Sequence, residues 1–260
     1  MQAPISPSHG ATPLPGWRRR LHRAGGGLGN LALTVGGFAV VVGLWALVAS
    51  ASSAAKVAGP AEVFDAVQAS WSNIPALTYV AFQTGGIGSA LVYTTVGVVL
   101  AVLVGALVGL PLGIALSQLR LARLTVEPVL IVVGTVPLLV LLPFLTLWFG
   151  TSRIAQSALV AVFALLTVAF ATRAAADAVP PHYLESATTQ GASARTRLFA
   201  VTLPAAMPDA IGAVRLALAA GWGWQCVAEL LGTGEGVGRV IQVTSRLQAT
   251  ADLFATLLCL

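Results

Sequence analysis

Long apolar stretches separated by short polar segments dominate this sequence. A bilayer core takes about 20 apolar helical residues to cross. Five stretches reach that length, and a sixth begins near residue 250 and runs about half as far to Leu260. The five stretches occupy about residues 31–50, 89–116, 129–149, 154–172 and 211–231. The pattern predicts an all-α integral membrane protein with about six transmembrane helices, the last one incomplete.

Composition supports this interpretation and excludes other classes. Hydrophobic residues make up 57% of the chain and charged residues 9%, whereas soluble domains are about half apolar and a quarter charged. The basic residues lie mostly between the apolar stretches, without the aromatic-lined basic face of a nucleic-acid-binding protein. Histidines and cysteines show no spacing typical of a metal site. We therefore expect neither nucleic-acid binding nor a metal.

The N-terminal part poses a choice between a tail with a membrane helix and a cleaved signal peptide. Residues 1–30 are rich in Pro, Gly and Arg and lack periodic apolar positions, which predicts a disordered basic tail. Residues 49–51 resemble a signal-peptide cleavage site. The apolar run before them exceeds the about 7–15 residues of a signal sequence. We therefore interpret residues 31–58 as a retained first transmembrane helix with an outer linker.

Small residues follow one another at four-residue intervals in the second stretch. Gly105, Gly109 and Gly113 fall on one face of a helix, together with Gly97 and Ala101. Such a face lets another helix backbone approach closely. Because the chain holds 27 glycines, a chance arrangement is the alternative. We predict that the stripe packs against a neighbouring helix of the membrane domain.

Basic residues indicate how the helices cross the membrane. Nine lie in the N-terminal tail, the loop after residue 116 and the stretch 173–208, and four lie on the opposite side. Short loops rich in Lys and Arg stay in the cytoplasm. We expect a cytoplasmic N-terminus and a cytoplasmic stretch 173–208.

That cytoplasmic stretch has the pattern of two short helices. Pro180 and Pro181 suit a helix start, and Tyr183 opens the first expected helix, which runs to Gln190. Gly191 provides a break, a serine at position 193 can cap the second helix, and Pro204 is expected to end it. The result is an exposed helical hairpin. Because nothing in the bilayer requires this hairpin, we interpret it as a docking element for another protein.

The hairpin also carries a recognisable motif. Glu185, Ser186 and Ala187, then Gly191, then Val201-x-Leu203-Pro204, resemble the EAA loop of ABC importer permeases. Ser186 replaces the first alanine of that motif, a change of one small residue for another. The loop covers about residues 177–208. The resemblance assigns contact with an ATPase subunit to the following residues: Tyr183, Glu185, Ser186, Ala187, Gly191, Ala192, Leu203 and Pro204.

The resemblance extends over about residues 59–260 and is strongest to permeases of the nitrate, sulfonate and taurine type. Further matching stretches lie at 59–63, 109–113, 127–128, 143–150 and 228–232. It implies a multi-pass protein of the bacterial inner membrane that conducts a small polar or anionic solute. It also implies four kinds of partner: a second permease copy forming a homodimer, two ATP-binding cassette subunits that hold ATP and Mg, an extracytoplasmic binding protein, and membrane lipid.

The chain itself shows no catalytic motif, so we do not expect an enzyme, and we expect no cofactor on it. The glycine-rich segment 232–238 lacks the Gly-Lys-Ser/Thr ending of a phosphate-binding loop and is interpreted as a flexible outer loop. The histidines form no catalytic constellation, since two lie in the tail and His182 lies in the hairpin. A secondary transporter or channel is the alternative class, although it would be expected to show coupling carboxylates or internal repeats.

Polar residues within the third and fifth stretches are candidates for the translocation path. Ionisable groups inside a membrane are costly and therefore mark function. Trp near an interface can equally be an anchor, and Glu229 can equally cap a helix or pair with Arg239. The roles of Glu229 and Arg215 stay open. The candidates are Thr135, Pro137, Trp222, Trp224, Gln225 and Glu229.

Overall fold

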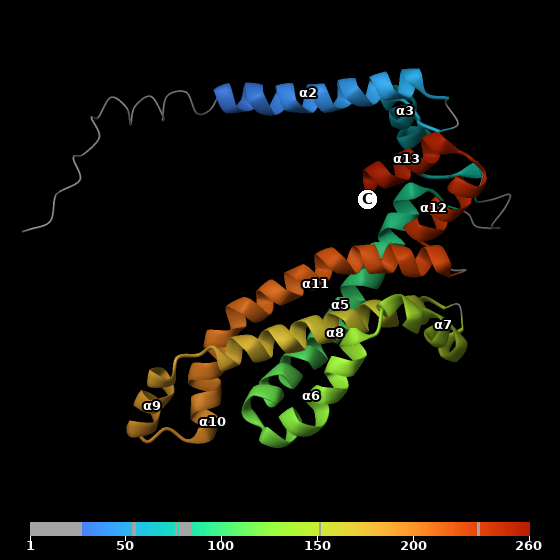
Figure 1. The fold of residues 1–260 in the computed structure, drawn as a ribbon. Coiled ribbons are helices and arrows are strands. Elements are labelled where there is room, and N and C mark those ends of the chain that lie inside the picture. Colours follow the sequence, from blue (N-terminus) through green and yellow to red (C-terminus); the bar gives the residue numbers. More distant parts are fainter. Residues whose placement is uncertain (1–27, 54–55, 76, 78–84, 151, 233–234) are drawn as a thin grey trace, which may run out of the picture. The chain divides into compact units, whose positions relative to one another are not determined.

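The computed structural model describes all residues except 1–27, 54–55, 76, 78–84, 151 and 233–234 (Figure 1). The expected disordered tail therefore lies almost wholly outside the described residues. Every regular element in the described ranges is a helix, so the expected all-α class is confirmed. The chain divides into two units, Met1–Pro60 and Ala61–Leu260.

The first unit contains one long apolar helix, α2 (Leu28–Ala51). At 1.5 Å per residue its 24 residues measure about 36 Å, which exceeds the about 30 Å of a bilayer core. The indole Nε1 of Trp45 donates a hydrogen bond to the carbonyl of Ala58 at 3.0 Å. This bond holds the end of the following linker against the helix.

The second unit begins with the short helix α3 (Pro60–Ser70). Its two neighbouring apolar residues differ in burial: Val63 is buried, whereas Phe64 is exposed. The hydroxyl of Ser70 donates to Asp252 Oδ1 at 2.6 Å, which joins α3 to the short apolar helix α13 (Thr250–Cys259).

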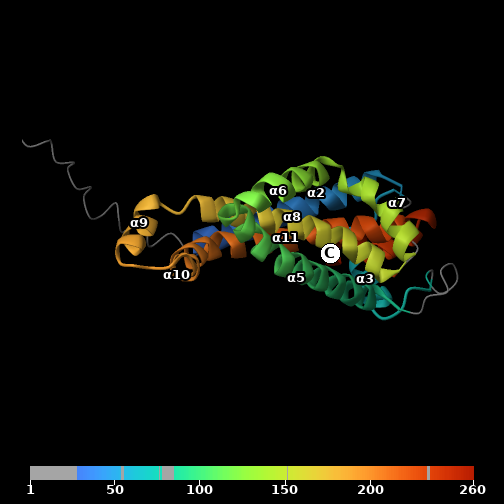
Figure 2. The same ribbon diagram turned by 90° about the horizontal axis from the view of Figure 1, so that it is seen from below.

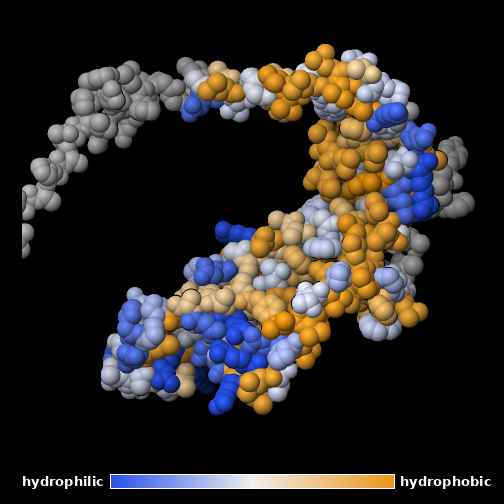
Figure 3. Space-filling model, in the orientation of Figure 1, coloured by the Kyte–Doolittle hydropathy of each residue, from blue (hydrophilic) through white to orange (hydrophobic). Residues whose placement is uncertain are grey.

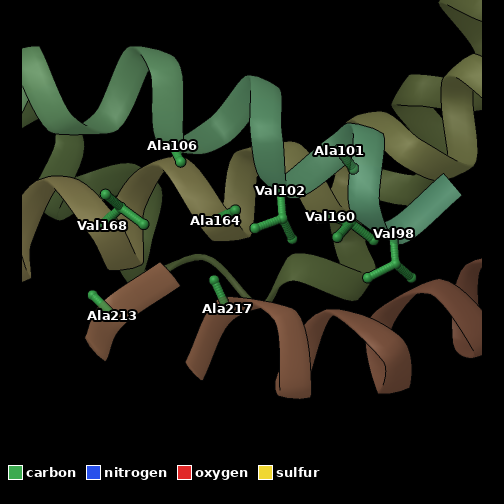
Figure 4. Packing of buried hydrophobic residues seen from close by; sticks show 9 residues of the cluster. All are labelled: Val98, Ala101, Val102, Ala106, Val160, Ala164, Val168, Ala213 and Ala217. Atoms are coloured by element: carbon green, nitrogen blue, oxygen red, sulfur yellow. The ribbon is translucent and has the colours of Figure 1, made fainter. Parts of the chain in front are cut away.

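Three long helices form the centre of this unit: α5 (Ile87–Gln118), α8 (Arg153–Asp177) and α11 (Leu203–Leu231). Helices α5 and α11 both pack along α8 and also contact each other. Figure 4 shows small and β-branched side chains from all three helices pointing toward one another. The cluster comprises Val98, Ala101, Val102, Ala106, Val160, Ala164, Val168, Ala213 and Ala217.

The glycine stripe of α5 lies directly on α8. A Cβ added at Gly105 would sit 2.6 Å from the Cβ of Ala164 and 2.7 Å from the carbonyl of Ala161. A Cβ at Gly113 would sit 2.5 Å from the carbonyl of Ala169. Real side chains do not approach so closely, so only glycine fits. The neighbouring helix to which the stripe is fitted therefore belongs to the same chain.

The expected third span is two helices instead of one. Helices α6 (Arg120–Thr135) and α7 (Leu138–Phe149) meet at a bend of 100°. Pro137 causes the break, because proline lacks an N–H and pushes the preceding residue out of the helical region. Val136 accordingly has φ −70° and ψ 128°. Pro143 lies inside α7 without ending it.

A continuous helical segment replaces the expected helix end at Pro204. Helix α10 (Ala194–Arg197) passes through a π turn (Leu198–Thr202) directly into α11, so that one helical run covers Ala194–Leu231. The N–H of Leu203 donates to the carbonyl of Leu198, five residues back. Because the π turn widens the helix here, the missing N–H of Pro204 is tolerated at the start of α11.

The glycine-rich segment leads into a helix that the sequence pattern did not predict. Helix α12 (Val237–Arg246) begins after Gly236, and both Gly236 and Gly238 are buried. The interpretation of residues 232–238 as a flexible outer loop is therefore wrong for this part. Four described helices are long and apolar enough to cross a membrane, or five spans if α6 and α7 count as one.

Candidate functional site

The hairpin lies at one end of the central helices, where α8 ends and the long helical run begins (Figures 1 and 2). Helix α9 (Pro181–Thr189) starts at a proline, as expected. Gly191 follows with φ +79°, a left-handed conformation that favours glycine. The hydroxyl of Ser193 accepts a hydrogen bond from the N–H of Thr196 at 3.1 Å and so caps α10.

Two further bonds hold the arms of the hairpin together. The N–H of Ala192 donates to the carbonyl of Ala187 at 3.0 Å, closing the turn. The guanidinium Nη1 of Arg197 donates to the hydroxyl of Thr188 at 2.6 Å, from α10 to α9. The hairpin is therefore a defined element, held by its own hydrogen bonds and not by burial.

An open cleft of about 1080 Å³ lies between the arms of the hairpin and the start of α11. Glu185 is exposed on α9, and within the described chain its carboxylate has no ion-pair partner. Leu203 instead lines a separate apolar cavity of about 470 Å³. The structure thus gathers most of the expected contact residues in the cleft: Tyr183, Ser186, Ala187, Gly191, Ala192 and Pro204.

A network of charges joins three helices at this same end. Arg173 of α8 contacts Glu127 of α6, and its Nε lies 3.4 Å from Asp177. Asp177 also pairs with Arg123 at 3.2 Å and accepts from the hydroxyl of Ser117 at 2.6 Å. In Figure 3 hydrophilic side chains gather around α9, α10 and the nearby start of α6. This end of the unit therefore has the character of a water-facing surface.

A second polar cluster lies at the opposite end, inside the protein. Glu229 is fully buried, and its carboxylate accepts from the hydroxyl of Thr94 at 2.9 and 3.0 Å. It also accepts from Gln225 Nε2 and from the N–H of Gly238, each at 3.0 Å. The hydroxyl of Thr94 in turn accepts from the N–H of Val237 at 3.0 Å. Three elements, α5, α11 and α12, meet at this carboxylate.

The other candidates for the path are dispersed. Thr135 is exposed at the end of α6, where its hydroxyl donates to the carbonyl of Val132 at 2.7 Å, and Pro137 lies at the break that follows. Trp222 and Trp224 are half-buried and pack against the apolar core. The structure joins Gln225 to Glu229, and the described residues show no hydrogen bond from either to Thr135.

Two residues with open roles also have defined surroundings. Arg239 donates to the side chain of Gln242, so Glu229 does not use it as an ion-pair partner among the described residues. Arg215 and Asp209 are both exposed on α11 and form no ion pair there. In the same described part, no group of three His, Cys, Asp or Glu residues is arranged to hold a metal ion.

Sequence reasoning missed three members of the buried cluster: Thr94, Val237 and Gly238. The sequence contained a signal for some of these residues. A glutamate near the end of an apolar stretch, followed after a few residues by a Gly-x-Gly segment, marks a carboxylate that can reach backbone N–H groups. Thr94 carried no comparable signal, because it lies 135 residues from Glu229 in sequence.

Comparison with known families gives one match that covers more than half of the chain. A family model described as "Binding-protein-dependent transport system inner membrane component" matches residues 105–260. The matched region includes the hairpin, the charge network and α12.

Two curated relatives are similar to more than half of the chain. The taurine transport system permease protein of Escherichia coli (strain K12) is 29% identical over 158 residues, which cover 61% of this chain and 58% of that protein. An aliphatic sulfonates transport permease protein of Bacillus subtilis (strain 168) is 32% identical over 156 residues, covering 60% and 56%. The chain thus spans less than two thirds of the length of these relatives.

Solved structures support the fold. An inward-facing form of the MetNI methionine ABC transporter matches with a TM-score of 0.58 at 21% identity, covering 66% of this chain and 87% of that chain. An amino acid ABC transporter crystallised with histidines matches with a TM-score of 0.57 at 20% identity, covering 66% and 85%. The arrangement of helices in the second unit is therefore one found in ABC transporters.

Proposed function

Because the chain belongs to the family of binding-protein-dependent transport system inner membrane components, we propose that it is the membrane-spanning permease subunit of an ATP-driven importer. The observation that carries this proposal is the exposed hairpin of α9 and α10. Its conformation is held by hydrogen bonds of its own, and an open cleft lies between its arms and the start of α11. Such an element suits docking to another protein. The comparisons favour this function over a secondary transporter or channel.

The hairpin is the proposed contact with an ATPase subunit, and it lies on the cytoplasmic side. The ion pairs of Arg123 and Arg173 at the same end support this orientation, because cytoplasmic surfaces are enriched in basic residues. In this arrangement the N-terminus is also cytoplasmic. ATP and Mg are bound by the partner ATPase subunits. The complete transporter contains two permease copies, two ATPase subunits and an extracytoplasmic binding protein in a bacterial inner membrane.

The proposed substrate is a small polar or anionic solute, in line with the taurine and sulfonate relatives. Thr135, Pro137, Trp222 and Trp224 are the proposed lining of its path. Gln225 and Glu229 are also candidates, and both are enclosed in the conformation described. They belong to the path only if another state of the transport cycle opens the bundle there.

Reversing the charge at the hairpin tests the docking proposal. Glu185 is exposed and makes no ion pair within the described chain, so Glu185→Arg should not affect folding. Against an ATPase surface that accepts the carboxylate, the new cation should reduce substrate uptake by at least about tenfold, equivalent to about 1.4 kcal/mol. Uptake and binding-protein-stimulated ATP hydrolysis are measured in proteoliposomes of the complete transporter.

Asp65→Arg provides the matched control, since it reverses an exposed charge on α3 in place of the hairpin. It should leave copurification of the ATPase subunit unchanged. Normal stimulation of ATP hydrolysis in the Glu185→Arg transporter would contradict the docking role. A wild-type complex that neither binds an ATPase subunit nor takes up solute would contradict the importer function itself.

Cysteine labelling tests the proposed path. In a background in which Cys226 and Cys259 are replaced by alanine, the Thr135→Cys variant should react readily with a water-soluble maleimide, because Thr135 is exposed at the end of its helix. The Gln225→Cys variant should be inert in the described conformation, where the side chain is fully buried. Its reactivity should rise when nucleotide is trapped with vanadate. Inertness of Gln225→Cys in every state would exclude Gln225 from the path.

A further inference from the structure

The geometry points to Glu229 as a positioning residue that fastens α12 to the outer end of α11, so that α12 follows the hairpin-bearing helix when it moves. This inference rests on the proposed function for its setting in a transport cycle. Its structural basis is the buried cluster of Thr94, Gln225, Glu229 and the start of α12.

The groups around the Glu229 carboxylate all donate hydrogen bonds. They come from a hydroxyl on α5, an amide on α11 and a backbone N–H on α12. The last donor, at Gly238, lies in the first turn of a helix, where backbone N–H groups have no partner within the helix and attract negative charge. Glu229 therefore caps α12 from a different helix. Thr94 adds to the cap, because its hydroxyl accepts from the N–H of Val237.

The packing at the start of α12 leaves no space for slippage. A Cβ at Gly238 would overlap the carbonyl of Cys226, and a Cβ at Gly236 would overlap the Glu229 carboxyl group. Gly236 also adopts φ +109°, which favours glycine. Both positions therefore permit the backbone of α12 to lie directly against α11.

A second attachment to α11 strengthens the link one turn further along α12. Gln242 Nε2 donates to the carbonyl of Leu230 at 2.7 Å, one residue after Glu229. The side chain of Gln242 is held in turn by Arg239. Helix α12 is thus joined to the last turn of α11 at two places, through a side chain of each helix.

The attachment matters because α11 is continuous with the hairpin. One helical run extends from Ala194 in the hairpin to Leu231 beside α12. The α11 part of this run has 29 residues and measures about 44 Å at 1.5 Å per residue. Displacing its hairpin end therefore displaces its outer end, and the Glu229 cap carries α12 along. Without the cap, α11 could move while α12 stayed with α5.

The test follows α12 by labelling an exposed position on it in the complete transporter. Ser245→Cys, in the cysteine-free background, is exposed near the end of α12. Its rate of reaction with a water-soluble maleimide is measured without nucleotide and after trapping with vanadate. In an otherwise unchanged transporter the two rates should differ by at least about threefold. Thr94→Val removes the hydroxyl at nearly constant volume, and it should lower the ratio of the two rates, because the cap loses its bond to Val237 and keeps only the one from Gly238 to Glu229.

Two neighbouring changes serve as controls. Thr94→Ser keeps the hydroxyl and should restore the ratio. Thr95→Val removes a hydroxyl that donates only to the carbonyl of Leu91 within α5, and it should leave the ratio unchanged. A merely structural role for Thr94 would lower the amount of assembled transporter without altering the ratio. A ratio that persists in Glu229→Gln, which weakens the direct bond between α11 and α12, would overturn the inference.

Glu229→Gln is the second variant. Its amide would place an N–H against groups that donate hydrogen bonds and need an acceptor. It should therefore also lower the ratio of the two labelling rates. Hydrogen exchange in the unmodified transporter tests the inference even if neither variant assembles. Hydrogen exchange at Val237 and Gly238 should stay slow in both nucleotide states, and rapid exchange in either state would overturn the inference. Absence of ATP hydrolysis and uptake by the unmodified complex would instead contradict the proposed function.

Discussion

Gly105→Leu should prevent the central helices from assembling. The Cβ alone would sit 2.6 Å from the Cβ of Ala164 and 2.7 Å from the carbonyl of Ala161, so a leucine must push α5 away from α8. This separation would open the cluster around Val102 and Ala164 that unites all three helices. The smaller change Gly105→Ala should still destabilise the domain by about 1–3 kcal/mol, the usual cost of overpacking.

Thermal unfolding of the detergent-solubilised protein measures this effect. For a domain of this size, about 1 kcal/mol corresponds to about 2–4 °C in Tm. Gly212→Ala is the matched control, since Gly212 lies within α11 and a Cβ there meets nothing within 4 Å. It should leave Tm unchanged or raise it slightly, because alanine is the better helix former. Equal Tm values for Gly105→Ala and Gly212→Ala would show that α5 and α8 are not held at this distance.

Arg173→Met should lower stability through the loss of a partly buried charge partner. The side chain of Glu127 is only 15% exposed and contacts Arg173, which also reaches Asp177. Removing the guanidinium leaves the Glu127 carboxylate poorly hydrated and without its cation. We expect a cost of about 1–3 kcal/mol, below the about 3–5 kcal/mol for a fully buried pair because Arg173 retains some contact with water.

Arg123→Met distinguishes this effect from a general need for positive charge. Arg123 pairs with Asp177, but the two side chains are 43% and 38% exposed. Exposed pairs contribute about 0–1 kcal/mol, so Tm should change little. Adding salt should reduce the Tm difference between wild type and Arg123→Met. The Tm difference between wild type and Arg173→Met should shrink less. A larger loss of Tm for Arg123→Met would mean that Glu127 does not depend on Arg173.

The hairpin shows how much local sequence can predict. A pair of prolines, a glycine and a serine define the start, the turn and the cap of two helices. Each acts through its own backbone preference or a hydrogen bond spanning three residues, so no distant contact is needed. Pro204 is the exception. Proline restricts the local backbone, but whether a helix ends there depends on the preceding turn, and a π turn at Leu198–Thr202 allowed it to continue.

Hydropathy along the chain was sufficient to indicate a helical membrane protein and to place most of its spans. Apolar length is a local property, and lipid requires every backbone group to be paired within the segment. The 100° bend between α6 and α7 and the existence of α12 did not follow from it. The bend and α12 both depend on which partners the packed helices offer to the backbone groups near Pro137 and near Gly236 and Gly238.

The sequence by itself determined the class of the protein, the family resemblance and the hairpin, because these rest on composition and on short-range spacing. Only the tertiary structure decided which groups surround the Glu229 carboxylate. Its partners come from α5, α11 and α12, and Thr94 is 135 residues away. A buried carboxylate could have lined a path, paired with Arg239 or capped a helix. Which groups donate to it in the described conformation depended on the helices that packing brought within 3.0 Å.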